Sequence, residues 1–142
     1  MAELSPSNNL PGLRIAAAHR QQMIEIARLA APLEACGILA GDGKESHLVI
    51  QITNALASPT RYQMSPEELV AAFWKLESDG LSVLAFFHSH PASAPHPSQT
   101  DLREHHYPGI PQIILGKAES RWKLRAYFLQ EQQIQEIPIQ YY

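Results

Sequence analysis

The segment LSVLAFFHSH, residues 81–90, carries the clearest structural signal in this chain of 142 residues. Leu81 to His88 is largely apolar and lacks the polar alternation of a strand with one face in water, which predicts a central strand covered on both faces. His88 and His90 end this segment, and side chains two residues apart on an extended backbone project to the same face. Both imidazoles can therefore reach one metal ion. Two histidines that only form hydrogen bonds at the end of a strand would give the same pattern.

A proline-rich loop follows the two histidines and leads into a short helix. Three prolines within residues 91–97 favour an ordered but irregular loop, and the helix is expected from Ser98 to about His106. Asp101 falls in its first turn, where the helix dipole favours a carboxylate. Two imidazoles and one carboxylate leave the fourth position of a tetrahedral ion open to water, as in catalytic zinc sites. A capping role for Ser98 and a dipole role for Asp101 are compatible with metal binding.

Such a site also needs a carboxylate that takes a proton from water and passes it to a leaving group. Glu34 is the candidate because it begins the apolar segment 34–40. On local evidence alone, a solvated acid after Pro32 is the better explanation of Glu34. Glu104, three residues after Asp101, competes for the role, although an exposed helix residue is its simpler interpretation.

The rest of the chain predicts a mixed α/β fold with a sheet of about six strands, two longer helices and one short helix. Apolar residues at spacings of three and four predict a helix over Ala17–Ala30, and a capping box at Ser65 starts another that ends near Ser78. Two apolar segments around a glycine-containing loop predict a β-hairpin. The expected strands are Leu13–Ile15, Glu34–Ala40, His47–Thr53, Leu81–His88, Ile110–Leu115, Trp122–Leu129 and, at an edge because it contains Pro138, Ile134–Gln140.

Composition favours one domain and argues against several partners. Hydrophobic residues make up 45% of the chain and charged residues 18%, enough apolar material for a real core. The net charge of −3, without a basic run, predicts no nucleic-acid partner. No apolar run approaches the ~18 residues of a membrane span, and no secretory signal is visible at the start. We therefore expect a cytoplasmic protein with a flexible lead-in, residues 1–12, and one domain, residues 13–142.

The spacing of the polar residues resembles the JAMM motif of the MPN (Mov34/PAD-1) metalloproteases. That motif places a glutamate upstream of His-x-His, then a serine after seven residues and an aspartate after two more. Every position is filled here, by Glu34, His88, His90, Ser98 and Asp101. The resemblance extends from Leu13 to about Leu129, and the fold that it implies is a single MPN-like domain with a central, mostly antiparallel sheet.

The resemblance also implies a role for each motif residue. His88, His90 and Asp101 would bind Zn²⁺. Glu34 would act as general base and then as general acid, and Ser98 would donate a hydrogen bond to the oxyanion. Cys36 is interpreted as a buried structural thiol rather than a nucleophile. The remaining histidines of this region are interpreted as loop and helix surface groups, one of which can support a metal ligand: His96, His105 and His106.

Members of this family hydrolyse isopeptide or peptide bonds after the C-terminal glycine of ubiquitin or ubiquitin-like proteins. The chain has no room for the insertions by which eukaryotic deubiquitinases grip ubiquitin chains, and its proline-rich loop is similar to that of the small prokaryotic branch. The resemblance therefore implies a zinc-dependent (iso)peptidase whose partner is the C-terminal tail of a ubiquitin-like or sulfur-carrier protein.

Two other functions stay open on the sequence. A non-catalytic MPN scaffold is one, although scaffolds usually lack part of the motif. A cupin-type metal enzyme also uses His-x-His, but its motif includes a glutamate a few residues after the second histidine. The segment from Pro91 to Asp101 contains no glutamate. The sequence determines neither the specific substrate nor the oligomeric state.

Overall fold

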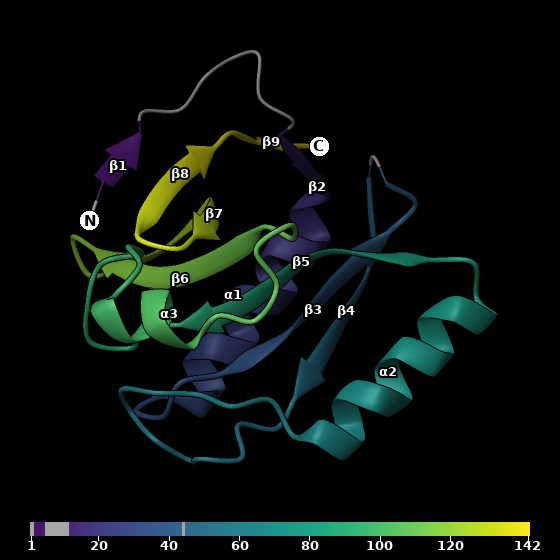
Figure 1. Ribbon diagram of the computed structural model, residues 1–142, viewed down its shortest axis with the longest axis horizontal. Coiled ribbons are helices and arrows are strands. Elements are labelled where there is room, and N and C mark those ends of the chain that lie inside the picture. Colours follow the sequence, from purple (N-terminus) through teal and green to yellow (C-terminus); the bar gives the residue numbers. More distant parts are fainter. Residues whose placement is uncertain (1, 5–11, 44) are drawn as a thin grey trace.

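The computed structural model describes residues 2–4, 12–43 and 45–142, with helices on both faces of a mixed sheet (Figure 1). The helices are α1 (Ala17–Ala30), α2 (Pro66–Ser78) and α3 (Gln99–Glu104). The strands are β1 (Ala2–Leu4), β2 (Leu13–Ile15), β3 (Cys36–Gly41), β4 (Ser46–Ile52), β5 (Ser82–Ser89), β6 (Gln112–Ala118), β7 (Arg121–Gln130), β8 (Gln133–Ile137) and β9 (Ile139–Tyr141). The mixed α/β prediction is confirmed, with both longer helices and the hairpin β3–β4 in the expected places.

The main sheet has seven strands in the order β1-β8-β7-β6-β5-β3-β4. Its neighbours are antiparallel except for β1–β8 and β5–β6, which confirms a mostly antiparallel sheet. Strand β5 lies in the interior, where His88 is opposite Cys36 of β3 and Ile114 of β6. The central strand predicted from residues 81–88 is therefore confirmed, and it carries the two histidines between two neighbouring strands.

Alternate residues of β5 face opposite layers. Phe87 packs in the cluster that contains Met23 and Ala27 of α1. Phe86 packs in the cluster on the other face, with Ala72 and Leu76 of α2. Helix α3 covers the same face as α2 but over β6, β7 and β8. Figure 1 shows α1 behind the sheet and α2 and α3 to either side in front of it, so that part of the front face lies between two helices.

The two helices of this front face begin at N-caps that the sequence predicts. Pro66 starts α2, and the Ser65 side chain accepts a hydrogen bond from Glu68 N. At α3 the capping box is reciprocal: Ser98 Oγ accepts from Asp101 N, and the Asp101 carboxylate accepts from Ser98 N. Because these bonds satisfy N–H groups that have no partner within the helix, they determine where the Asp101 side chain lies. This helix ends at Glu104, two residues earlier than expected.

The C-terminal segment differs from the prediction. The single edge strand expected over Ile134–Gln140 is two strands, β8 and β9, which belong to different sheets. Pro138 separates them because it has no N–H to continue the ladder with β7, while its carbonyl oxygen accepts from Leu13 N at 3.0 Å. Strand β9 then pairs with β2 in a parallel two-stranded sheet.

The expected lead-in, residues 1–12, also differs in the part that the structure describes. Residues 2–4 form β1, which pairs in parallel with β8, so β8 is not an edge strand. Residues 5–11 lie outside the described residues. Among the described helices, none is long and apolar enough to cross a lipid bilayer.

Candidate metal centre

Two histidines and one aspartate converge at the end of β5. His88 Nε2 lies 3.1 Å from Asp101 Oδ1, and His90 Nε2 lies 3.1 Å from Asp101 Oδ2. One ligand atom from each of the three residues lies within 4.8 Å of the other two, and all three side chains are buried. The carboxylate thus faces both imidazoles at once, which is the arrangement expected of a three-residue metal site.

Neighbouring groups orient the two imidazoles. His90 Nδ1 is 3.2 Å from the Ala94 carbonyl oxygen. Since a carbonyl only accepts, Nδ1 carries the proton and Nε2 is left to bind a metal. The His88 ring stacks on Tyr62, with centroids 4.5 Å apart and an interplanar angle of 23°. Tyr62 comes from the loop before α2, and nothing in the local sequence pattern connects that loop with β5, so the sequence does not predict this contact.

Three features of the site fit a bound metal. Nε2 of His88 contacts Asp101 Oδ1 at 3.1 Å but outside good hydrogen-bond geometry, and Nδ1 of His88 and Oε1 of Glu34 are buried without a hydrogen-bond partner. Burial without a partner costs free energy, so such groups indicate a ligand or ion that satisfies them. The donor set, two nitrogens and a carboxylate, is one that zinc uses in catalytic sites. The triad is therefore consistent with a zinc ion.

In the metal-free site, the charged forms of both Asp101 and His90 are favoured. Burial alone would raise the pKa of Asp101, but the imidazoles of His88 and His90 and the backbone N–H of Ser98 outweigh it, and the pKa lies well below its usual range. Burial alone would lower the pKa of His90, yet the hydrogen bond from its ring to Asp101 raises it. Asp101 is consequently a carboxylate at neutral pH, as a metal ligand must be.

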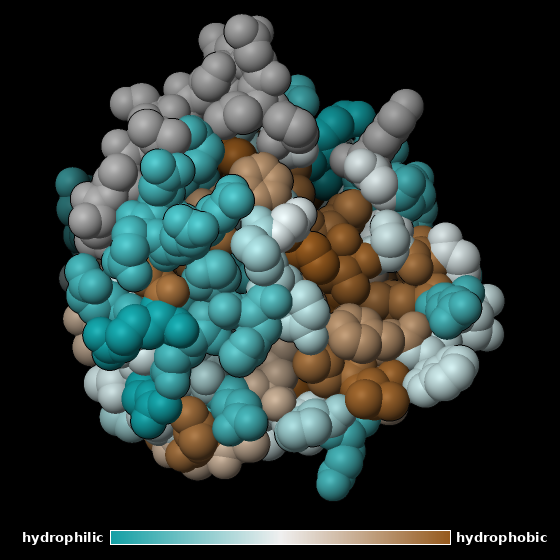
Figure 2. Space-filling view, viewed as in Figure 1, coloured by the Kyte–Doolittle hydropathy of each residue, from teal (hydrophilic) through white to brown (hydrophobic). Residues whose placement is uncertain are grey.

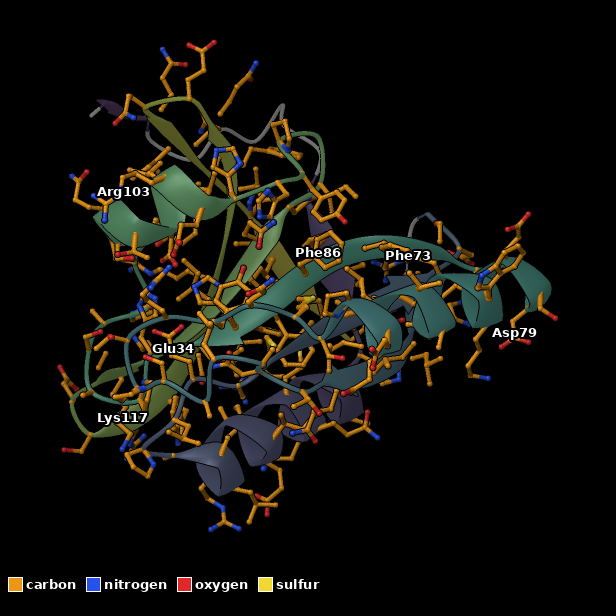
Figure 3. All side chains as sticks on the ribbon, turned by 60° about the horizontal axis from the view of Figure 1, so that its bottom comes forward. Glu34, Phe73, Asp79, Phe86, Arg103 and Lys117 are labelled. Atoms are coloured by element: carbon orange, nitrogen blue, oxygen red, sulfur yellow. The ribbon has the colours of Figure 1, made fainter. Side chains whose placement is uncertain are left out.

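Glu34 lies beside this triad and is 5% exposed. The backbone just after it is tied to β5, because Ala35 N donates to Ser89 Oγ at 2.8 Å and Ser89 N donates to Ala35 O at 3.0 Å. Figure 3 shows Glu34 at the end of the molecule that carries α3, far from Asp79 at the end of α2. Burial raises its pKa to about 8, with a smaller lowering effect of His90 and a raising effect of Asp101.

The other candidates from the sequence have different surroundings. Glu104 is paired with Arg61 at two positions, including 2.6 Å between Oε2 and Nη2, and this pairing lowers its pKa. Cys36 is fully buried, its thiol donates to the Ile52 carbonyl oxygen, and burial raises its pKa to about 12. The structure thus places Glu34, rather than Glu104, as the unpaired acid, and Cys36 as a packed thiol.

The loop between the histidines and α3 is held against the sheet. Tyr127 of β7 is fully buried and its hydroxyl donates to the Pro95 carbonyl oxygen at 2.8 Å. Gly116 of β6 lies so close to the loop that a Cβ atom there would be 2.3 Å from Pro95 N. Because this loop leads directly to Ser98, these contacts help to set where Ser98 and Asp101 lie. The local sequence pattern around Gly116 and Tyr127 indicates no role for either residue in the site.

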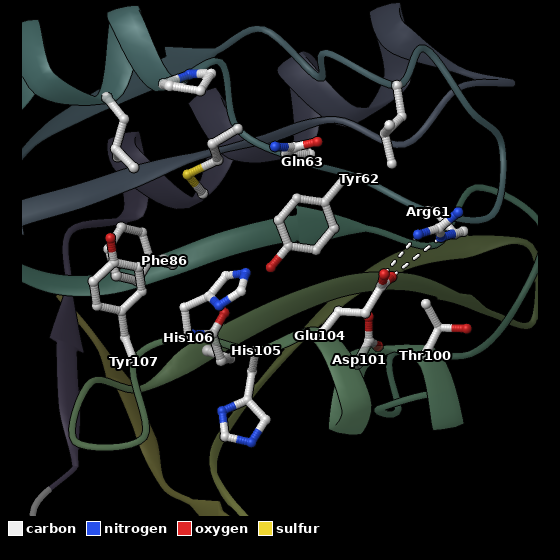
Figure 4. A pocket seen from close by; sticks show the side chains of 15 residues that line it. Arg61, Tyr62, Gln63, Phe86, Thr100, Asp101, Glu104, His105, His106 and Tyr107 are labelled. Atoms are coloured by element: carbon white, nitrogen blue, oxygen red, sulfur yellow. Dashed lines mark hydrogen bonds and ion pairs between the residues drawn. The ribbon is translucent and has the colours of Figure 1, made fainter.

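A pocket of about 440 Å³ opens from the triad between α2 and α3. Asp101 and the Arg61–Glu104 ion pair lie on one side of it, Phe86 and Tyr107 lie on the other, and Tyr62 lies between them (Figure 4). Its lining also includes His105, which is partly buried, and His106, which is exposed as the sequence predicts. The ring of His96 lies edge-on to Tyr127, 6.0 Å away between centroids.

Comparison with known proteins agrees with this geometry. The model of the family Prok-JAB, prokaryotic homologs of the JAB domain, matches residues 16–129. The chain is 37% identical over 109 residues to a desampylase of Haloferax volcanii, covering 72% of this chain and 78% of the relative. It is 32% identical over 122 residues to the CysO-cysteine peptidase of Mycobacterium tuberculosis, covering 82% of each.

Solved structures show the same fold. The solution structure of protein DSY2949 from Desulfitobacterium hafniense superposes with a TM-score of 0.82 at 26% sequence identity, over 92% of this chain and 94% of that one. The family match covers the helices, the hairpin and every motif residue from Glu34 to Asp101. The chain therefore belongs to the family of prokaryotic homologs of the JAB domain.

Proposed function

We propose that this protein is a zinc-dependent (iso)peptidase that hydrolyses the bond after the C-terminal glycine of a ubiquitin-like or sulfur-carrier protein. The observation that carries the proposal is the buried, unpaired Glu34 beside the triad of His88, His90 and Asp101. A non-catalytic scaffold needs no unpaired buried acid at that point, and a cupin-type enzyme needs a glutamate that the loop after His90 lacks.

The triad residues would hold the zinc ion through Nε2 of His88, Nε2 of His90 and the carboxylate of Asp101. A zinc ion bound there supplies a Lewis acid that polarises the scissile carbonyl and lowers the pKa of a water molecule. Glu34 then takes the proton of the attacking water and delivers it to the leaving nitrogen. Burial raises the pKa of Glu34 in the metal-free site, and the positive charge of a bound zinc ion would lower it again, which favours the carboxylate form that accepts the proton.

Ser98 is proposed to stabilise negative charge on the carbonyl oxygen. Its Oγ accepts a hydrogen bond from Asp101 N at 3.0 Å, and this leaves the hydroxyl proton to be donated elsewhere. Capping and catalysis are therefore compatible at Ser98. Preorganised donors of this kind act strongly because they need no reorientation during the reaction.

The substrate class is supported by the names of the relatives and by the pocket. A desampylase and a CysO-cysteine peptidase are among the proteins similar to this chain. The pocket between α2 and α3 leads away from the triad and is large enough for several residues of an extended tail. A tail that ends in two glycines lets the scissile carbonyl approach the metal closely. A cytoplasmic location stays a prediction from the sequence.

The test is cleavage of a ubiquitin-like carrier that bears one cysteine or a short peptide after its terminal glycine. Mass spectrometry of the fusion with zinc-loaded protein should show the carrier trimmed to that glycine, and 1,10-phenanthroline should abolish the reaction. Glu34→Gln is the matched control, because it keeps shape and zinc but cannot accept a proton. If such fusions stay intact while unrelated peptides are cut, the protein is a general peptidase on the same site.

A further inference from the structure

The pocket beside the triad has two chemically different ends. At one end lie Asp101 and the ion pair of Arg61 with Glu104. The other end has apolar walls, in which the ring of Phe86 packs on that of Tyr107 with centroids 4.6 Å apart. Its remaining apolar lining comes from the loop before α2 and from the first turn of α2, through Leu56, Met64, Pro66 and Leu69. In the view of Figure 2, hydrophobic residues gather towards α2 and hydrophilic residues over α3.

The apolar end contains one buried polar side chain, that of Gln112. Gln112 is the first residue of β6, lies opposite Phe86, and is 4% exposed. Its Oε1 has no hydrogen-bond partner although it is buried. Leaving a buried acceptor unpaired costs free energy, and Gln112 has no role in the chemistry proposed for the triad. Because Gln112 lines the pocket and the χ3 torsion of a glutamine is soft, a turn of the amide brings this buried acceptor to a donor on whatever occupies the pocket.

The spacing along β5 indicates which part of a tail reaches Gln112. Phe86 precedes His88 by two residues, which is about 7 Å at a strand rise of about 3.3 Å per residue. An extended peptide advances by the same rise, so two residues of a tail span the same distance. With the carbonyl of the terminal glycine at the triad, the second glycine covers the first step. The residue before the glycine pair then lies over Phe86 and Gln112.

We propose that this end of the pocket is a subsite for the residue that immediately precedes the glycine pair, and that it selects an apolar side chain there. Gln112 accepts a hydrogen bond from a backbone N–H of the tail and so aligns it along β5. The inference rests on the proposed function and adds the determinant of substrate choice. Glycines have no side chain to recognise, so the first position that can distinguish one tail from another is the one that this subsite receives.

The first test varies the substrate, so that folding of the enzyme is not in question. Carrier fusions identical except for Leu, Asp or Lys before the glycine pair are compared by kcat/KM. We expect the Leu fusion to exceed the Asp and Lys fusions by at least about tenfold, because an apolar pocket that must bury a charge loses binding. Changing the residue after the scissile bond should have a much smaller effect.

The second test varies the enzyme. Gln112→Leu removes the acceptor at similar volume and should raise KM several-fold for the Leu fusion, with kcat and zinc content unchanged. Gln51→Leu is the control, because Gln51 is an exposed glutamine on β4. A loss of folding would instead lower zinc content and kcat together.

Binding of short peptides separates this inference from the proposed function. Peptides ending in Leu-Gly-Gly and Asp-Gly-Gly are titrated into the zinc-loaded protein by calorimetry, which needs no turnover. Tighter binding of the Leu peptide, weakened by Gln112→Leu, supports the subsite even if no fusion is cleaved. Cleavage at equal rates whichever residue precedes the glycines overturns the subsite and leaves the proposed function intact. Rates that depend instead on the residue after the scissile bond overturn it as well.

Discussion

The two faces of the central sheet are formed by the same strands but bury different chemistry. On the face under α1, the side chains of Phe87, Ile113 and Leu115 are fully buried in an apolar cluster. On the face between α2 and α3, the neighbouring residues His88 and Gln112 are also buried, yet each has a polar atom without a partner. One face is therefore completed by its own side chains, whereas on the other some polar atoms are not satisfied by the side chains around them.

The two faces therefore contribute differently to the free energy of folding: the α1 face stabilises the fold, and the polar atoms of the site reduce that stability. Apolar burial stabilises the α1 face by about 1.5–3 kcal/mol for each large side chain. An unpaired buried acceptor on the other face costs a comparable amount. The sheet tolerates this cost because the two faces alternate residue by residue along β5, so that the stable layer lies directly beneath the site.

The largest effect is expected from breaking the triad. His90→Ala should abolish zinc binding, which elemental analysis of the purified protein measures, and lower kcat/KM by about 10³-fold or more because several kcal/mol of transition-state stabilisation are lost. Phe87→Ala, on the opposite face, should instead lower the free energy of unfolding by about 3–5 kcal/mol while the folded protein keeps its zinc. Full zinc content in His90→Ala would contradict the ligand assignment.

Glu34→Gln should have the next largest effect, and it should lower activity without lowering the zinc content or the stability of the fold. Zinc content should be unchanged, whereas kcat should fall by about 10²–10⁴-fold, since a general base is lost and nothing else. Metal analysis and steady-state kinetics on the same preparation check this. Loss of zinc would make Glu34 a ligand, and wild-type turnover would transfer the role of base to Glu104.

Ser98→Ala should lower kcat by about 10²–10³-fold if its hydroxyl stabilises the oxyanion. As an N-cap of α3 it also contributes about 0.5–2 kcal/mol to stability, so the melting temperature must be measured alongside. Ser65→Ala is the matched control, because Ser65 caps α2 away from the triad. A Ser98→Ala variant with reduced stability and unchanged kcat would leave only the capping role.

The smallest effect concerns the pH dependence of the metal-free protein. The pKa of Glu34 is about 8 in the folded chain, above its ordinary 4.5. The folded state therefore binds more protons than the unfolded state between these values, and the contribution of Glu34 to stability is full below about pH 4.5 and lost as the pH rises through about 8. Denaturant unfolding at pH 5 and pH 9 should show metal-free Glu34→Gln gaining on the wild type at pH 9. An equal difference at both pH values would contradict the raised pKa.

Local patterns were sufficient for much of the fold. The capping box at Ser65 and the spacing of apolar residues in Ala17–Ala30 located α1 and α2, because caps and amphipathic periodicity act within a few residues. The end of the C-terminal strand was harder to predict. Pro138 was interpreted as a mark of an edge strand, but it separates two strands whose partners, β7 and β2, lie elsewhere in the chain.

By itself, the sequence predicted the chemistry of the site: the proposed ligand types, their order and the proposed acid upstream all follow from Glu34, His88, His90, Ser98 and Asp101. The tertiary structure alone decided what surrounds them. Tyr62 on the ring of His88, Tyr127 on the loop carbonyl of Pro95 and Gln112 in the pocket come from segments far apart in sequence. Contacts of that kind leave no periodic trace, because they depend on which strands become neighbours in the sheet, and this is settled by the packing of the whole chain rather than by any segment of it.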